Sequence, residues 1–205
     1  MKPIEFWNFD EEYLELFKTV EYTLVDHARC YFLYKIAKNF AEMDGEAAEV
    51  GVYKGGTARI LTSIFSRQKK NIYLFDTFDG MPITDKNRDK HTEGDFADCS
   101  LEAVEKLLSD LSNYKIYKGY FPKTASDIIK KKFCFVHIDV DIYQSVKDCC
   151  EFFYNKMVHG GIMVFDDYGW PSCPGAKEAV DEFFYDKREA VVYIPSGQAI
   201  VLKLP

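Results

Sequence analysis

Short runs of β-branched and aromatic residues alternate along the chain with longer segments in which apolar residues recur at helical spacing. Strands are predicted over seven of these runs: 48–53, 71–76, 115–118, 134–139, 162–166, 190–194 and 199–204. Such an alternation is typical of a mostly parallel sheet with helices on both faces. The pattern therefore predicts an α/β fold built on a seven-stranded sheet.

Apolar stripes of helical period lie between the predicted strands. The clearest stripe recurs at spacings of three and four residues and comprises Val146, Cys149, Cys150, Phe153 and Met157. Similar stripes predict covering helices over 58–65, 101–111 and 179–184. Gly160 and Gly161 are expected to end the helix before the fifth strand, since glycine is favoured just beyond a helix C-terminus.

The two ends of the chain complete the predicted architecture. The last two strands are joined only by residues 195–198, too few for a crossover helix, so they are expected to pair antiparallel as a hairpin. Residues 1–46 carry two amphipathic stripes, which predict helices that cover the sheet or form a lid over the site. Residues 47–205 would form the core of a single domain, as the length of 205 residues allows.

Composition and charge exclude several classes of protein. With 26 Lys+Arg against 33 Asp+Glu and neither sign gathered in one half, no nucleic-acid partner is expected. No apolar run approaches the roughly 18 residues of a membrane span. The segment after Met1 lacks the apolar core of a secretory signal, so a cytoplasmic location is expected. The six cysteines include no Cys-x-x-Cys pair, which predicts buried free thiols rather than a zinc site or disulfides.

In an open α/β sheet the ligand crevice lies beyond the carboxyl ends of the strands. The first strand is followed by a glycine-rich turn, Gly51-x-x-x-Gly55-Gly56, whose glycines allow close approach of a ligand. Its spacing matches neither the dinucleotide fingerprint nor the phosphate loop, so a tight turn and a nucleoside site both remain open. Asp76 ends the second strand, where either a ribose-hydroxyl acceptor or a helix N-cap is expected.

Four carboxylates follow two strands that are expected to be neighbours. Asp139 ends the fourth predicted strand and Asp141 lies just beyond it, whereas Asp166 ends the fifth and Asp167 follows directly. Like charges this close raise one another's pKa unless a cation lies between them. Oxygen ligands suit a hard divalent ion such as Mg²⁺, Ca²⁺ or Mn²⁺, and the available His and Cys residues do not complete a zinc set.

The segment 84–95 is polar throughout and is expected to be either a solvated surface loop or a mobile lid over the crevice. It contains His91, the one histidine that we expect to reach a substrate or to belong to a lid. His137 alternates inward on an apolar strand, so we expect it to be a core residue with its hydrogen bonds satisfied.

Four blocks of sequence together resemble the macrocin O-methyltransferase (TylF-like) family of S-adenosylmethionine-dependent enzymes. They are EVGVYKGGTA, YLFDTFDGMP, HIDVDIYQS and VFDDYGWPSCPGAKEAVDEFF, and they span residues 49–184. The resemblance implies the class I methyltransferase fold, with a Rossmann-like sheet that ends in an antiparallel hairpin. It also favours a homo-oligomer.

The resemblance implies a role for each matching residue. Glu49, Gly51 and Gly55 match the motif that cradles the methionine end of the cofactor, and Asp76 matches the acid that binds the ribose. Asp95 and Phe96 match a block near the adenine. Asp139, Asp166 and Asp167 match the magnesium ligands, and Asp141 matches the proposed general base.

The function expected from these roles is methyl transfer from S-adenosylmethionine to a hydroxyl of a sugar or another small-molecule acceptor. A bound Mg²⁺, or another hard divalent cation, would lower the pKa of the hydroxyl, and an aspartate would accept its proton. Two alternatives remain at this stage. One is a metal-dependent glycosyltransferase acting on a nucleotide sugar, and the other is a non-catalytic scaffold that binds the cofactor.

Overall fold

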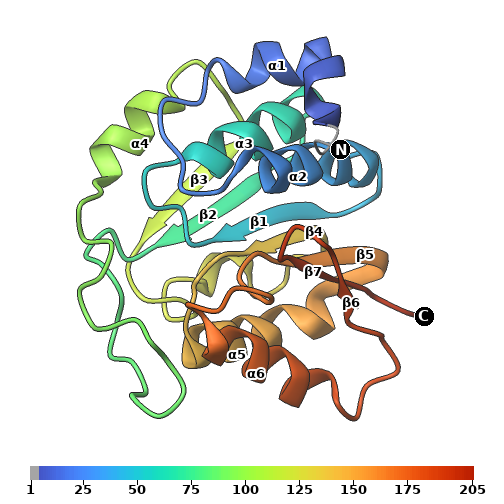
Figure 1. Cartoon of the computed structure of the whole chain (residues 1–205). Helices are drawn as coiled ribbons and strands as arrows, with labels where there is room; N and C mark the ends of the chain where they lie inside the picture. Colours follow the sequence, from blue (N-terminus) through green and yellow to red (C-terminus); the bar gives the residue numbers. More distant parts are fainter. Residues whose placement is uncertain (1–4) are drawn as a thin grey trace.

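A seven-stranded sheet forms the centre of the molecule (Figure 1). The computed structural model describes residues 5–205, so the first four residues of the predicted N-terminal cover lie outside the described residues. In chain order the strands are β1 (Glu46–Val50), β2 (Ile72–Asp76), β3 (Tyr114–Lys118), β4 (Phe133–Ile138), β5 (Met157–Phe165), β6 (Val192–Tyr193) and β7 (Ala199–Leu202). Across the sheet their order is β3-β2-β1-β4-β5-β7-β6.

The sheet is parallel except at its C-terminal edge. The strands from β3 to β5 pair parallel with their neighbours. β7 pairs antiparallel with β5 and with β6. The turn between β6 and β7 is closed by the amide of Ile194, which donates to the carbonyl of Gln198 over 2.8 Å. The predicted mostly parallel sheet with a C-terminal hairpin is confirmed.

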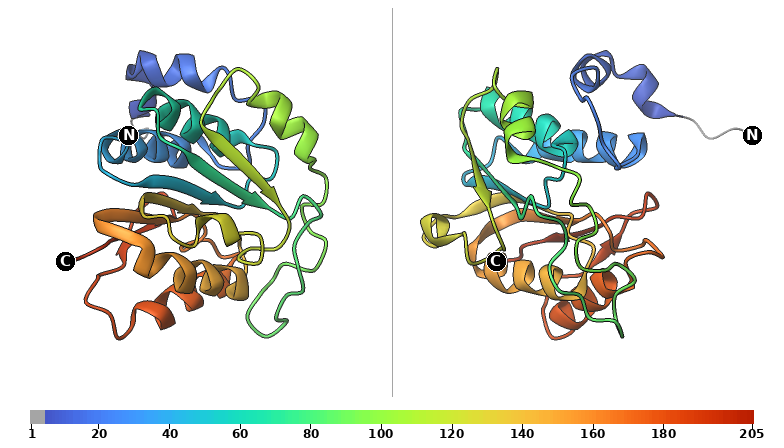
Figure 2. Two further views of the ribbon diagram at one scale, coloured as in Figure 1. Left: turned by 180° about the vertical axis from the view of Figure 1, so that it is seen from behind. Right: turned by 90° about the vertical axis from the view of Figure 1, so that its left-hand side faces the viewer.

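Helices cover both faces of the sheet, as Figures 1 and 2 show from three directions. One face carries α1 (Glu11–Phe17), α2 (His27–Phe40), α3 (Gly56–Arg67) and α4 (Leu101–Leu107). The other carries α5 (Tyr143–Phe153) and α6 (Pro174–Phe184). Short 3₁₀ turns lie at Phe6–Phe9, Ser126–Ile128 and Tyr154–Lys156. Among the helices within residues 5–205, none combines the length and the apolar character needed to cross a lipid bilayer.

The alternation of side chains along β5 builds a separate core on each face of the sheet. Ile162 and Val164 pack with the helices of the N-terminal half. Met163 and Phe165 pack with α5 and α6. Because successive strand residues point to opposite faces, a continuous apolar run is what a strand covered on both sides requires.

The prediction that Gly160 and Gly161 end a helix is wrong. The helix α5 already ends at Phe153, and both glycines lie inside β5. The amide of Gly160 donates to the carbonyl of Lys203 (2.7 Å), and the amide of Lys203 donates to the carbonyl of Gly161 (2.8 Å). Gly160 has φ +81°, so the glycines accommodate an irregularity in the strand where its pairing with β4 shifts register.

The first strand ends at Val50, three residues before the predicted end at Tyr53. Gly51 leaves the extended conformation with φ +91°, which glycine adopts without steric cost. The chain turns at this point toward α3 and forms one wall of the site.

Candidate functional site

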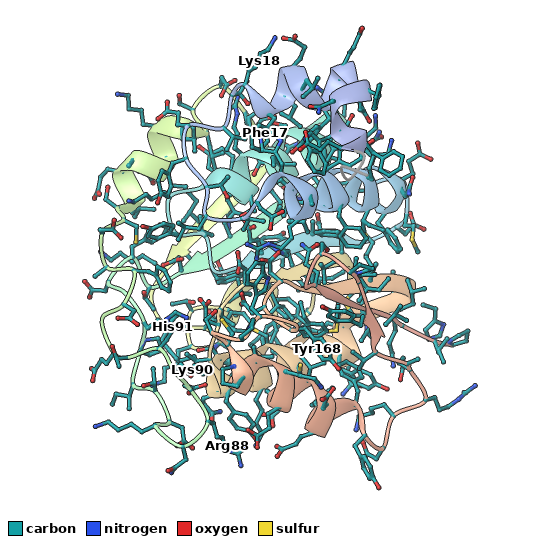
Figure 3. All side chains as sticks on the ribbon, in the orientation of Figure 1. Phe17, Lys18, Arg88, Lys90, His91 and Tyr168 are labelled. Atoms are coloured by element: carbon teal, nitrogen blue, oxygen red, sulfur yellow. The ribbon has the colours of Figure 1, made fainter. Side chains whose placement is uncertain are left out.

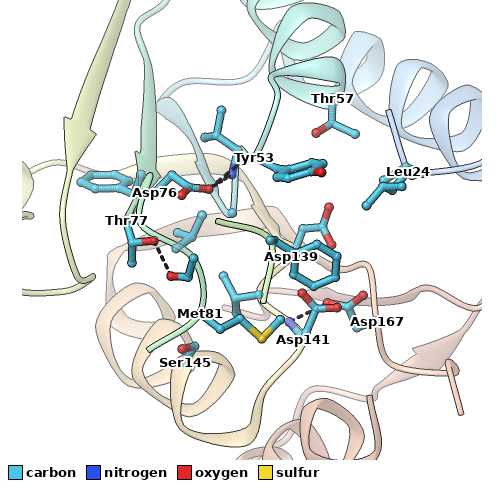
Figure 4. A pocket seen from close by; sticks show the side chains of 18 of the residues that line it. Leu24, Tyr53, Thr57, Asp76, Thr77, Met81, Asp139, Asp141, Ser145 and Asp167 are labelled. Carbon is cyan, nitrogen blue, oxygen red and sulfur yellow. Dashed lines mark hydrogen bonds between the residues drawn. The ribbon is translucent and has the colours of Figure 1, made fainter. Parts of the chain in front are cut away.

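A cavity lies at the carboxyl ends of β1, β2, β4 and β5, where an open α/β sheet is expected to bind its ligand (Figure 4). Seven residues predicted from the sequence line it: Gly51, Asp76, His91, Phe96, Asp139, Asp141 and Asp167. Glu49, Gly55, Asp95 and Asp166 do not line it. The structure therefore brings most of the predicted site residues together around one cavity and leaves four of them outside its lining.

Gly51 is the residue of the turn that meets the tightest steric limit. A Cβ atom at this position would lie 1.7 Å from the carbonyl oxygen of Asp139. Gly55 serves a different purpose, because it precedes α3 with φ +86° and its Cβ would lie 3.0 Å from the side chain of Leu107. Gly51 thus lets the first turn approach the fourth strand, whereas Gly55 allows α3 and α4 to pack.

Asp76 fixes the turn that follows β1. One carboxylate oxygen accepts hydrogen bonds from the backbone amides of Val52 (2.7 Å) and Tyr53 (2.8 Å). The other accepts a hydrogen bond from the amide of Phe78 (2.7 Å). No helix begins directly after Asp76, so the N-cap interpretation is wrong. A carboxylate oxygen has more than one lone pair, and Asp76 faces the cavity as well as the turn.

Glu49, His137 and Asp166 form a buried chain of charged groups behind the cavity, and all three side chains are fully buried. His137 donates from Nδ1 to Glu49 (2.9 Å) and from Nε2 to Asp166 (3.4 Å). Burial alone would lower the pKa of His137, but the bonds to Asp166 and Glu49 outweigh it and raise the pKa to about 10. The prediction of a satisfied core histidine is confirmed, and Glu49 is its partner rather than a lining residue.

The carboxylates of Asp139, Asp166 and Asp167 converge, with ligand atoms within 4.8 Å of one another. Burial, followed by the charge of Asp166, raises the pKa of Asp139 well above its usual range. Burial, followed by the charges of Asp141 and Asp139, does the same to Asp167. These shifts are those of carboxylates that lack a sufficient positive charge between them.

Arg29, on α2, supplies one positive charge to this group. Its guanidinium pairs with Asp166 and lies over the ring of Trp170, 4.6 Å from the ring centroid. Burial opposes the ionisation of Asp166, but His137, Arg29 and Gln198 outweigh it and lower the pKa of that carboxyl. Arg29 was not predicted from the sequence, because it lies 137 residues from Asp166 and no local pattern links the two.

The carboxylate trio fits a hard divalent cation. Asp166 is already compensated by Arg29 and His137, whereas Asp139 and Asp167 keep raised pKa values. A set of carboxylate oxygens without nitrogen or sulfur is the donor set that Mg²⁺ and Ca²⁺ prefer. A dication beside Asp139 and Asp167 would stabilise their ionised forms.

Asp141 stands in the turn after β4 with φ +58°. Its amide donates to the carboxylate of Asp167 over 2.9 Å, as Figure 4 shows. Its own carboxylate accepts a hydrogen bond from the thiol of Cys173 (3.2 Å) and lies 3.8 Å from Nε2 of His91. Burial is the main cause of its raised pKa, so this carboxylate is a stronger base than an exposed one.

The polar segment 84–95 lies against the helices α5 and α6 (Figure 3). Arg88 pairs with Glu178 (3.1 Å), and Asp89 accepts the amide of Tyr143 (2.8 Å). Lys90 donates to the carbonyl of Pro171 over 2.5 Å. The segment is therefore attached through its polar groups, and this attachment places His91 at the cavity.

Asp95 and Phe96 follow this segment and take different positions. The carboxylate of Asp95 accepts a hydrogen bond from the backbone amide of Thr92 (3.0 Å) and lies 3.2 Å from Nδ1 of His91. These bonds lower the pKa of Asp95. Phe96 lines the cavity with φ +63° and contacts the ring of Tyr53 edge-on, with 5.7 Å between centroids.

Several aromatic and sulfur-containing residues of the cavity were not predicted from the sequence. They are Tyr53, Met81, Tyr120, Phe121, Trp170 and Cys173. Most of them come within a few residues of a strand end or of the glycine turn, which is the signal that could have indicated them. Together with Leu24 they add apolar surface to a cavity whose lining also includes the carboxylates of Asp76, Asp139, Asp141 and Asp167.

A comparison with protein families extends these observations. The family model described as Macrocin-O-methyltransferase (TylF) matches residues 15–191. Mycinamicin III 3''-O-methyltransferase of Micromonospora griseorubida is 25% identical over 82% of this chain and 72% of its own length. Demethyldecarbamoylnovobiocin O-methyltransferase of Streptomyces niveus is 26% identical over 68% of this chain. This chain spans 58% of the length of the second relative.

Solved structures share the fold. The O-methyltransferase NovP has a TM-score of 0.75 at 20% identity, covering 89% of this chain and 82% of that chain. The calicheamicin methyltransferase CalS11 has a TM-score of 0.72 at 15% identity, covering 98% of this chain and 94% of that chain. The predicted class I methyltransferase fold is confirmed.

Proposed function

Because this chain belongs to the macrocin O-methyltransferase (TylF) family, we propose that it transfers the methyl group of S-adenosylmethionine to a hydroxyl of a small-molecule acceptor, with a sugar as the expected acceptor group. The main support for this proposal is the set of residues that line the cavity. The turn fixed by Asp76 and the carboxylate of Asp141 open into the same cavity. A donor held by the turn and an acceptor held near Asp141 would therefore meet.

The cofactor is assigned to the side of the cavity that contains Gly51 and Asp76. Gly51 removes side-chain bulk where the backbone would approach the ligand, and Asp76 offers carboxylate oxygens to ribose hydroxyls. Tyr53 and Phe96 line the same part of the cavity with their rings in edge-on contact, which suits a flat base. Glu49 and Gly55 do not line the cavity. They are proposed to support this side indirectly, Glu49 by binding His137 and Gly55 by starting α3.

The acceptor is assigned to the side that contains Asp141. Asp139 and Asp167, with Asp166, would hold Mg²⁺, which when bound lowers the pKa of an acceptor hydroxyl. Asp141 would accept the hydroxyl proton, and its raised pKa makes it a better proton acceptor. The hydroxyl oxygen then forms a bond to the methyl carbon as the carbon–sulfur bond breaks, leaving S-adenosylhomocysteine.

The rim of the cavity supports a sugar as the acceptor. Leu24 and Trp170 are partly exposed there, and Ser172 adds a hydroxyl. A sugar presents both an apolar face and hydroxyl groups, which such a mixed surface can contact. A further relative supports the same class, since its name is 8-demethyl-8-(2,3-dimethoxy-alpha-L-rhamnosyl)-tetracenomycin-C 4'-O-methyltransferase, from Streptomyces olivaceus.

The N-terminal helices and the sheet are proposed to act as one catalytic domain. Arg29 on α2 reaches Asp166 at the end of β5, so the N-terminal segment contributes a charge to the proposed metal site. Removal of this segment would leave Asp166 without its guanidinium partner.

Methyl transfer from radiolabelled S-adenosylmethionine tests the proposal. The acceptors would be a panel of free sugars, nucleotide sugars and glycosylated small molecules, each with Mg²⁺ and with chelator. The proposal predicts labelled product from at least one sugar-containing acceptor, and less of it with chelator. Release of nucleoside diphosphate from a nucleotide sugar, without methylation of any acceptor, would support the glycosyltransferase alternative.

A further inference from the structure

A second cluster of metal-binding side chains lies beside the carboxylate trio. It consists of His91 from the polar segment, Asp141 from the turn after β4, and Cys173 from the residue before α6. Figure 3 labels His91 and Figure 4 labels Asp141. The sequence offered no sign of this cluster, because its members come from three separate segments and follow none of the spacings typical of zinc sites.

The distances between the three ligand atoms suit a tetrahedral ion. Cys173 Sγ lies 3.2 Å from Asp141 Oδ1 and 3.8 Å from His91 Nε2, which in turn lies 3.8 Å from Asp141 Oδ1. Zinc bonds of about 2.3 Å to sulfur and about 2.0–2.1 Å to nitrogen and oxygen place neighbouring ligand atoms about 3.3–3.6 Å apart. Shifts of a few tenths of an ångström would therefore bring all three atoms into a first coordination shell.

The other nitrogen of His91 has the partner that a zinc-binding histidine commonly has. Its Nδ1 lies 3.2 Å from the carboxylate of Asp95, and that carboxylate is held by the amide of Thr92 at 3.0 Å. A carboxylate at Nδ1 fixes the ring and directs Nε2 toward the metal. Asp95, which does not line the cavity, has a role in this arrangement.

The two clusters differ in the ions that they suit. Imidazole and thiolate ligands favour borderline ions such as Zn²⁺, whereas the trio of Asp139, Asp166 and Asp167 offers oxygen alone. They are joined by the hydrogen bond from the Asp141 amide to Asp167. A hard ion and a softer ion could therefore occupy neighbouring positions.

We propose that His91, Asp141 and Cys173 form a Zn²⁺ site with its fourth position open to the cavity. Binding releases the thiol proton of Cys173 to solvent and forms a zinc–thiolate bond. The ion would occupy the carboxylate that the proposed function uses as proton acceptor, so Zn²⁺ would inhibit methyl transfer. Only this inhibition rests on the proposed function.

Cobalt substitution in the intact chain tests the site, because thiolate-bound tetrahedral Co²⁺ has a characteristic absorption spectrum. We expect the sulfur-to-cobalt band in the wild-type protein, its loss in Cys173→Ser, and its retention in the control Cys99→Ser, whose thiol lies elsewhere. Circular dichroism would confirm that each variant is folded. A band that persists in folded Cys173→Ser, or that disappears equally in Cys99→Ser, would overturn the proposal.

Metal competition and a variant of Asp95, the carboxylate at Nδ1 of His91, give measurements that do not depend on Cys173. Zn²⁺ should displace Co²⁺, whereas a large excess of Mg²⁺ should not. Asp95→Asn should weaken Zn²⁺ binding by roughly 10–100-fold. Ready displacement by Mg²⁺, or unchanged Zn²⁺ affinity in Asp95→Asn, would count against the site.

The inhibition is measured separately from the binding. With a methyl acceptor in hand and Mg²⁺ present, added Zn²⁺ should slow methyl transfer, chelation of the zinc should restore it, and Cys173→Ser should need more Zn²⁺ for the same effect. If Co²⁺ binds as described while S-adenosylhomocysteine does not bind, the zinc site stands and the proposed function fails. If S-adenosylhomocysteine binds but Co²⁺ does not bind through Cys173, the proposed function stands and the zinc site is wrong.

Discussion

The backbone amide of Asp141 donates a 2.9 Å hydrogen bond to the carboxylate of Asp167. The residue proposed to accept a proton is thus positioned by a residue proposed to bind metal. Asp141 has φ +58°, a conformation that few residues other than glycine adopt and that Asp tolerates better than most. The strained turn aims its carboxylate into the cavity, which is consistent with a functional constraint.

Substitution of Asp141 by Asn should abolish most turnover and leave cofactor affinity nearly intact. The amide keeps the size of the side chain but cannot accept the hydroxyl proton, and a general base contributes typically about 10²–10⁴-fold to rate. Turnover with a methyl acceptor and titration with S-adenosylhomocysteine measure the two effects separately. A parallel loss of cofactor binding would show that Asp141 supports the cofactor instead.

Gly51→Ala should be much more destabilising than Gly94→Ala. Both glycines have positive φ, +91° and +87°, but a Cβ at Gly51 meets the Asp139 carbonyl at 1.7 Å, whereas nothing lies within 4 Å of one at Gly94. The control should cost only backbone strain of about 1–2 kcal/mol. The clash at Gly51 should cost more than about 4 kcal/mol or prevent folding. Chemical denaturation compares the two, and equal costs would contradict the close approach of the two turns.

Glu189 should contribute stability that disappears in acid. It is buried and accepts hydrogen bonds from Lys203 (2.7 Å) and Tyr154 (2.9 Å). Burial opposes its ionisation, but these bonds outweigh burial and lower its pKa from 4.5 to about 2. A lowered pKa stabilises the fold above the unfolded-state value of 4.5, and this stabilisation is lost as the pH falls toward 2.

Glu189→Gln should therefore lower the free energy of unfolding by about 2–3 kcal/mol at neutral pH. The difference from wild type should shrink as the pH falls below 4.5. Denaturant titrations at several pH values measure it, with the exposed Glu105→Gln as control. A difference that does not change with pH would mean that the effect is one of packing alone.

Asp139→Asn should make the stability of the protein insensitive to Mg²⁺. Mg²⁺ should raise the melting temperature of the wild type, because a ligand that binds only the folded state stabilises it. The variant should show little or no rise. In chelator the variant should be at least as stable as wild type at neutral pH, since it removes a buried carboxylate whose pKa is raised. An Mg²⁺-dependent rise in the variant would place the ion elsewhere.

The parts of the fold that depend on local pattern could be predicted from the sequence. The stripe from Val146 to Met157 identifies α5, although Met157 itself begins β5, and the four-residue connection 195–198 requires a hairpin. The prediction for Gly160 was wrong because its role depends on a hydrogen bond to Lys203, which follows β7 and is distant in the sequence. Helix ends and strand bulges use glycine for the same conformational reason, so the residue type alone does not separate them.

The candidate site divides in the same way. Strand ends indicate which carboxylates gather, and Asp139, Asp166 and Asp167 do converge. The direction in which each side chain points, and the distant residue that it contacts, do not depend on the neighbouring sequence and so could not be predicted from it. Glu49 faces His137 instead of the cavity, and Arg29 compensates Asp166 from the other end of the chain. The first contact depends on the pairing of β1 with β4, and the second depends on the packing of α2 against the sheet.

Calorimetric titration of S-adenosylhomocysteine measures whether the cavity binds the product form of the cofactor. We expect saturable binding by the wild type in Mg²⁺ and in chelator, and unchanged binding by the exposed control Asp79→Asn. Asp76→Asn should bind roughly 10–100-fold more weakly, because it loses a charged partner of the turn. A nucleotide sugar is titrated alongside. No binding of S-adenosylhomocysteine, with metal-dependent binding of the nucleotide sugar instead, would show that the cavity is not a methyltransferase site.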